Sequence, residues 1–162
     1  MLRGELTGGA ALQEALGADV PAAWPPELYD ENAVRFMLDW MSAHPDAHDW
    51  GFYYLTLREA NGSRTLIGAG GFRGAPDAGG CVEIGYALLP EFQHRGYATE
   101  AVRAWLDFAL ADARVNAVTA QTLASLTPSI RVLERTGFTY TGAGTDTDVP
   151  AGEQVVRYTR TR

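Results

Sequence analysis

Lysine is absent from this chain of 162 residues, and cysteine occurs only once, at Cys81. Every fixed cation is therefore an arginine, and neither an internal disulfide nor a cysteine-rich metal site can form. No histidine and acid pair lies near Cys81 in the sequence. A lone cysteine at the start of a strand more often packs than reacts, so we do not expect it to be a nucleophile.

Positive charge is scarce as well, because 13 arginines face 20 acidic residues and the formal net charge is −7. This balance opposes a nucleic-acid partner, whose phosphates must be neutralised by clustered cations. An amine or other cationic substrate is attracted more readily. No apolar run reaches the length of a membrane span, and residues 1–9 lack the charged and apolar regions of a signal peptide. We therefore expect no membrane association and a cytoplasmic location.

Hydrophobic residues make up 46% of the chain, which at this length suits one domain over residues 1–162. Asn61-Gly62 between two β-prone runs predicts a hairpin. The pattern predicts an α/β (α+β) fold, a mixed central sheet with helices on its faces. We expect four helices, over residues 6–16, from a cap at Asp30 or Asn32 to about Ala43, over 99–111, and from Thr127-Pro128 to Gly137. We expect strands over residues 51–60, 65–72, 81–89, 117–122, 138–141 and 155–161.

The most informative segment is Gln93-His94-Arg95-Gly96-Tyr97-Ala98, between a strand ending near Leu89 and the helix that opens near Thr99. A helix N-terminus presents unpaired backbone N–H groups and the positive end of the helix dipole. A glycine at its approach lets the main chain close on an anion such as a pyrophosphate. A single glycine in such a turn is a weak signal, and an ordinary strand-to-helix turn is the alternative.

Gln93-x-x-Gly96-x-Ala98 resembles the acetyl-CoA signature of the GNAT superfamily of N-acetyltransferases. The flanks Val82-Glu83-Ile84-Gly85-Tyr86 and Tyr97-Ala98-Thr99-Glu100-Ala101 are similar to the branch that contains the ribosomal-protein N-terminal acetyltransferases. The segment from Ser129 to Gly137-Phe138 resembles the second motif of that branch. The resemblance is strong over residues 65–140 and weak over the first 50 residues.

This resemblance implies a GNAT fold and acetyl-CoA as cosubstrate, with no metal. The cofactor would contact the turn from Gln93 through His94, Arg95, Gly96, Tyr97 and Ala98 to Thr99. It also implies that the backbone N–H of Leu88 faces the thioester carbonyl, where it would stabilise the tetrahedral intermediate. The alternative for Leu88 is an ordinary sheet residue.

Two side chains are candidates for proton transfer. Attack on a thioester requires a neutral amine, so a base must remove a proton, and Glu83 shares a strand face with the small residues Cys81, Gly85 and Ala87. The alternative is a structural carboxylate, either on a solvated face or paired with an arginine. Ser129 stands where similar proteins place a serine that protonates the CoA thiolate, although a serine in the first turn of a helix often only bonds the backbone.

The chain departs from the family pattern at three places. Leu126 replaces the usual pantetheine-binding Asn, and Leu133 replaces a Tyr that many members use as the acid, which leaves Ser129, Tyr140 or water. The usual first strand is missing or shortened to residues 1–3, so the sheet edge is incomplete or completed by a second copy in a homodimer.

The remaining candidates are weaker. His44 and His48 have Asp46 and Asp49 nearby, but Pro45 disrupts the helix that their spacing would need, so we expect no metal site. The tryptophans and the Phe52-Tyr53-Tyr54 run either fill the core or line an acceptor pocket.

Two functions follow from these observations. The first is an N-acetyltransferase that transfers an acetyl group by direct attack of a small amine or a protein N-terminus. The alternative is a non-catalytic acyl-CoA-binding regulatory module that keeps the fold.

Overall fold

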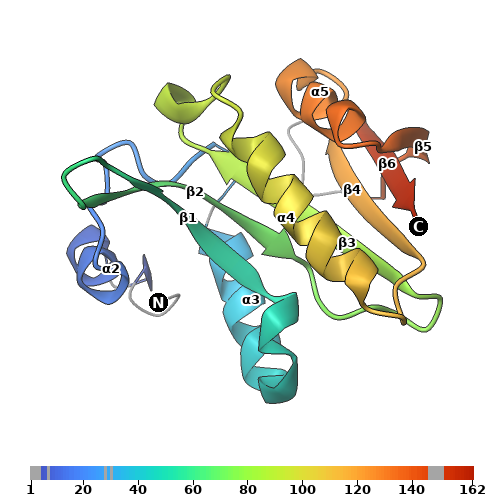
Figure 1. The fold of residues 1–162 in the computed structure, drawn as a ribbon, viewed down its shortest axis with the longest axis horizontal. Helices are drawn as coiled ribbons and strands as arrows, with labels where there is room; N and C mark the ends of the chain where they lie inside the picture. The colour runs from blue at the N-terminus through green and yellow to red at the C-terminus, as the bar shows by residue number, and fades with distance from the viewer. Residues whose placement is uncertain (1–4, 7, 28, 30, 146–151) are drawn as a thin grey trace. The chain divides into compact units, whose positions relative to one another are not determined.

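The computed structural model describes residues 5–6, 8–27, 29, 31–145 and 152–162. Six strands follow the order β1-β2-β3-β4-β6-β5 in one sheet, with parallel pairing between β3 and β4 and antiparallel pairing in β1-β2, β4-β6 and β5-β6 (Figure 1). The predicted mixed sheet is confirmed. Residues 1–3, to which the first strand would be shortened if it is present, and Asp30, one of the two candidate caps, lie outside the described residues.

The contacts divide the chain into two compact units. The first combines the described parts of Met1–Gly71 with Tyr86–Gln93, and the second combines Phe72–Gly85 with His94–Arg162. The helices and strands of the first unit are α2 (Gly9–Leu16), α3 (Glu31–Ala43), η1 (Pro45–Trp50), β1 (Phe52–Arg58), most of β2 (Arg64–Phe72), the end of β3 (Cys81–Leu88) and η2 (Pro90–Phe92).

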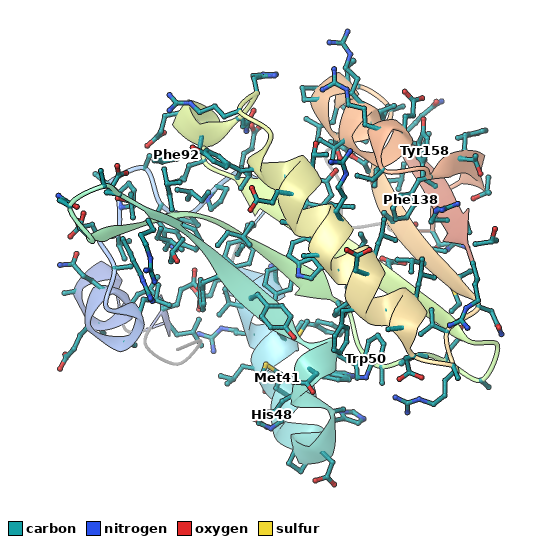
Figure 2. All side chains as sticks on the ribbon, viewed as in Figure 1. Met41, His48, Trp50, Phe92, Phe138 and Tyr158 are labelled. Carbon is teal, nitrogen blue, oxygen red and sulfur yellow. The ribbon has the colours of Figure 1, made fainter. Side chains whose placement is uncertain are left out.

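The β1-β2 hairpin of the first unit forms as the sequence predicts. Asn61-Gly62 lies at its turn, and Gly62 has a φ of 87°, a conformation that favours glycine. Val34 and Met37 of α3 pack with Tyr29 and with Ala69 of β2 in one buried cluster. Pro45 ends α3, as expected, and a 3₁₀ segment follows in which Trp50 is buried, near the labelled Met41 and His48 (Figure 2).

The second unit contains the start of β3, α4 (Tyr97–Ala111), β4 (Ala117–Leu123), α5 (Thr127–Arg135), β5 (Thr139–Ala143) and β6 (Val155–Thr161). Helices α4 and α5 contact each other, and both contact β4. Their shared core includes Val102, Val118, Leu133 and Phe138, all at most 3% exposed. Phe138 and Tyr158, both labelled in Figure 2, are buried in this unit.

Three predicted helix starts were wrong by a residue or more. Helix α4 begins at Tyr97 rather than Thr99, because Gly96 itself is the N-cap. Helix α5 begins at Thr127, so the N-cap is Leu126 and not Thr127, and no side chain caps the helix. Helix α2 begins at Gly9 rather than Leu6. Among the described residues, no helix combines the length and the apolar character needed to cross a membrane.

Candidate active site

The turn before α4 contains two residues in the left-handed region of backbone space. His94 has a φ of 60° and Gly96 a φ of 91°. The left-handed conformation is uncommon for a residue with a side chain and costs about 1–2 kcal/mol. Left-handed residues in a turn are one way of aiming neighbouring N–H groups at an anion. The backbone of this turn is therefore shaped in a way that suits anion binding.

Gly96 leaves the start of α4 open. It is the N-cap and has no side chain, and the first backbone bond of the helix runs from the N–H of Glu100 to the carbonyl of Gly96 at 3.0 Å. The N–H groups of Tyr97, Ala98 and Thr99 thus have no acceptor within the helix. A Cβ added at Gly96 would meet no atom of the chain within 4 Å. Positive φ, not lack of space, is what requires glycine here.

Gln93 and Leu88 are brought together within the first unit. The side-chain amide of Gln93 donates to the carbonyl oxygen of Leu88 at 3.0 Å, which closes the turn around η2. Leu88 is the last residue of β3 and is 8% exposed. Gln93 therefore shapes the approach to the signature turn through its own side chain.

Gly68 of β2 is a supporting residue that the sequence reading missed. A Cβ at this position would lie 2.4 Å from the carbonyl oxygen of Ala87 and 2.5 Å from Cδ2 of Leu88. Only glycine lets β2 come this close to the end of β3. The signal was a glycine inside a strand pattern, which often marks a close backbone approach.

Glu83 lies on β3 in the second unit, and both of its carboxylate oxygens accept hydrogen bonds. Nη1 of Arg73 is 3.1 Å from Oε1, and Nε2 of Gln121 is 3.0 Å from Oε2. The side chain is 23% exposed. The predicted alternation along the strand is confirmed, since Val82 and Ile84 on the other face are buried. Each carboxylate oxygen can accept more than one hydrogen bond, so pairing with Arg73 leaves capacity for a proton.

Ser129 lies in the first turn of α5 and is half-buried. Its backbone N–H donates to the carbonyl of Leu126 at 3.0 Å. Leu133, where many relatives would have a tyrosine, is fully buried in the core. Tyr140, the other candidate acid, is 60% exposed and packs edge-on against Tyr158 with ring centroids 5.8 Å apart.

The aromatic residues of the first unit surround a carboxylate. Glu5 accepts hydrogen bonds from the indole of Trp24 at 2.7 Å and from the hydroxyl of Tyr29 at 3.0 Å, and Tyr54 donates to the same carboxylate. Burial, followed by the charge and hydrogen bond of Glu5, raises the pKa of Tyr29. Burial and the hydrogen bond to Glu5 raise the pKa of Tyr54. These rings pack on the core of the first unit, which supports the core interpretation of the aromatic run.

The mixed sheet and the glycine-capped turn at the start of α4 define an α/β protein whose helix start has a shape that suits an anionic ligand. The family model described as Acetyltransferase (GNAT) domain matches residues 10–139, and the chain belongs to this family. The resemblance stated from the signature residues is thereby confirmed, and the protein is an acetyltransferase.

A curated relative is an uncharacterized N-acetyltransferase, YjdG, of Bacillus subtilis. It is 34% identical over 123 residues, which cover 76% of this chain and 71% of that protein. Among solved structures, the microcin C7 self-immunity acetyltransferase MccE in complex with acetyl-CoA and AMP has a TM-score of 0.65 at 18% identity, covering 86% of this chain and 76% of that one.

A second structural neighbour comes from Salmonella typhimurium and modifies the N-terminal serine of the ribosomal protein L7/L12. Its TM-score is 0.61 at 16% identity, covering 81% of this chain and 72% of that one. At these identities the two structures establish the shared fold.

Proposed function

We propose that this acetyltransferase uses acetyl-CoA as cosubstrate and transfers the acetyl group directly to a primary amine of a small molecule or a protein N-terminus. The observation that carries the proposal is the start of α4, where Gly96 leaves three backbone N–H groups without a helical acceptor. A pyrophosphate bound there would gain from both the N–H groups and the helix dipole. The acetyl-CoA in the MccE structure supports the same cosubstrate here.

In the proposed reaction the amine nitrogen attacks the thioester carbon, and the carbon–sulfur bond then breaks. Glu83 takes the proton that the amine loses, directly or through water. The N–H of Leu88 stabilises the negative oxygen of the tetrahedral intermediate. The sulfur leaves with the bonding electron pair and receives a proton from Ser129, so the products are an amide and free CoA. The turn from Gln93 to Thr99 binds the cosubstrate.

A non-catalytic acyl-CoA-binding module is the second candidate. Leu126 and Leu133 occupy positions where relatives carry polar groups, and Leu126 is 38% exposed. Glu83 is also paired with Arg73, as a purely structural carboxylate would be. This candidate predicts binding of acetyl-CoA without turnover.

One screen separates the two. Acetyl-CoA is incubated with the protein and a panel of small amines and N-terminal peptides, and free thiol is followed over time. We expect thiol release that depends on the amine, together with an acetylated product detected by mass. Tight binding of acetyl-CoA without amine-dependent thiol release across the panel would favour the regulatory module. Absence of acetyl-CoA binding would contradict both.

A further inference from the structure

A chain of polar side chains connects Glu83 to an arginine on β6. The side-chain amide nitrogen of Gln121, on β4, donates to Glu83. The side-chain oxygen Oε1 of Gln121 accepts from the backbone N–H of Thr145 at 2.6 Å. The hydroxyl of Thr145 accepts from Nη2 of Arg157 at 3.1 Å. Arg157 is also the strand partner of Gln121. All of these residues belong to the second unit.

The guanidinium of Arg157 is only partly satisfied. Its Nε is buried and has no hydrogen-bond partner. Over the described part of the chain, its one hydrogen-bonding side-chain partner is the neutral hydroxyl of Thr145, and no carboxylate pairs with it. Arg157 as a whole is half-buried, but a buried donor atom without an acceptor is unfavourable. The guanidinium of Arg157 can therefore donate to an anion, and no described residue supplies that anion.

We infer that Arg157 binds a carboxylate carried by the acceptor, so that the enzyme acts on amines that also bear a carboxylate. The planar guanidinium matches a carboxylate with two parallel N–H bonds. The inference rests on the proposed function, in which Glu83 receives the proton of the amine.

The spacing of the strands supports this assignment. Arg157 lies on β6 and Glu83 on β3, with β4 between them. Neighbouring strands are about 4.8 Å apart, so the two backbones are separated by roughly 10 Å, and both side chains extend toward Gln121. An acceptor that places its amine at Glu83 would need its carboxylate only a few bonds away. Amino acids and peptides with an acidic residue next to the N-terminus meet this requirement, whereas polyamines would place a second cation beside Arg157.

The first test measures binding independently of turnover. The protein is saturated with CoA and titrated calorimetrically with matched probes, serine against serinamide and Ser-Asp amide against Ser-Asn amide. We expect the carboxylate member of at least one pair to bind roughly tenfold more tightly or better, because hydrogen bonds between charged groups exceed neutral ones. Arg157→Gln should remove this difference.

Matched variants control for charge and folding. Arg160→Gln removes the same charge from an exposed position of β6, three residues away, and should keep the preference. Arg157→Lys keeps the charge without the planar fork and should restore part of it. Thermal unfolding of each variant shows that the folded protein is being titrated.

Kinetics complete the test. With the same pairs and acetyl-CoA, Arg157→Gln should raise KM for the carboxylate member and leave kcat, and the KM for acetyl-CoA, nearly unchanged. Equal turnover of both members by the unmodified protein would overturn the inference while the proposed function stands. Arg157-dependent binding of the carboxylate member without any acetyl transfer would support the carboxylate site and contradict the proposed function.

Two further results would overturn the carboxylate assignment. One is a preference that survives in Arg157→Gln. The other is Arg157-dependent binding of inorganic phosphate when neither matched pair is discriminated, because the guanidinium would then bind a phosphate.

Discussion

At the scale of single residues, Gly96 determines how closely a ligand can approach the start of α4. Gly96→Val places a β-branched side chain at a φ of 91°, a strain of about 1–2 kcal/mol, and projects it into the space outside the chain. We expect the dissociation constant of acetyl-CoA, measured by calorimetry, to rise at least tenfold, because one methyl contact already excludes close backbone approach to a phosphate.

Gly62→Val is the matched control for this change. Gly62 has a φ of 87°, and an added Cβ there would also meet nothing within 4 Å. Both variants should lose similar stability in thermal unfolding, while only Gly96→Val loses affinity. An unchanged dissociation constant in folded Gly96→Val protein would remove the signature turn from the binding site.

Glu83 can be tested through the pH dependence of turnover. Glu83→Gln keeps the size of the side chain but only one acceptor oxygen, which can serve Arg73 or Gln121 and not both, so thermal unfolding is measured alongside turnover. If Glu83 is the base, turnover should fall most at low pH, where the amine is protonated, and less at high pH, where free amine is available. Asp112→Asn, which removes a carboxylate that is paired with Arg114, serves as the control. Equal losses for Glu83→Gln at every pH would indicate that this side chain only positions its neighbours.

At the scale of helices, Ser129→Ala separates proton donation from stabilisation of the start of α5. The N-cap is Leu126, which makes no side-chain cap bond. If the Ser129 hydroxyl acts as the acid, its loss should lower turnover and leave the melting temperature nearly unchanged. Loss of an acid should lower turnover roughly tenfold to a hundredfold. The effect is modest because a CoA thiol, with a pKa of about 8.5, is already a fairly good leaving group as the thiolate.

Thr127→Ala removes a hydroxyl from the same turn and should leave turnover unchanged. Destabilised Ser129→Ala protein, by about 1 kcal/mol, with normal turnover would assign the hydroxyl to the helix instead. The acid would then be sought at Tyr140 or in water.

Most helices and strands were predictable because their signals are local. The α3 helix, the hairpin at Asn61-Gly62 and the β6 strand end within about two residues of the expected bounds. The predicted start of α4 was wrong because a glycine N-cap has no side chain that would mark it in the sequence. The predicted start of α5 was wrong because its N-cap, Leu126, is not one of the residue types that usually cap a helix. Backbone conformation, not side-chain chemistry, determined these two helix starts.

At the scale of the whole molecule, the buried tyrosines predict a loss of stability in alkali. The pKa of Tyr29 and that of Tyr54 are raised above the usual 10.0 by burial, so the folded state keeps both hydroxyls protonated. Their contribution is present below about pH 10 and is lost as pH rises further, because the unfolded chain releases these protons first.

Ultraviolet absorbance of tyrosinate during an alkaline titration checks this expectation. We expect at least Tyr29 and Tyr54, of the seven tyrosines, to ionise only when the protein unfolds, and Tyr54→Phe to reduce the number of late-ionising tyrosines by one. The control is Tyr140→Phe, which removes a tyrosine that is 60% exposed. Ionisation of all seven tyrosines in one step before unfolding would show that Glu5 and burial do not hold these protons.

Three expectations about the whole chain stay predictions: that residues 1–162 form one domain, that the sheet edge is incomplete or completed in a homodimer, and that the protein is cytoplasmic. The division of contacts runs through β3, and the residues expected to begin the sheet lie outside the described part of the chain. Sedimentation at several protein concentrations would measure the oligomeric state.

The sequence by itself determined the family, the signature turn from Gln93 to Thr99 and the strand face of Glu83, because these depend on residues close together in the chain. Only the tertiary structure brought Arg157 and Thr145 to Gln121 and Glu83, and Gly68 to Leu88. Alternation predicts which face a side chain takes. It contains no information on which strands pair or in what register, and that pairing decides which polar groups meet across β3, β4 and β6.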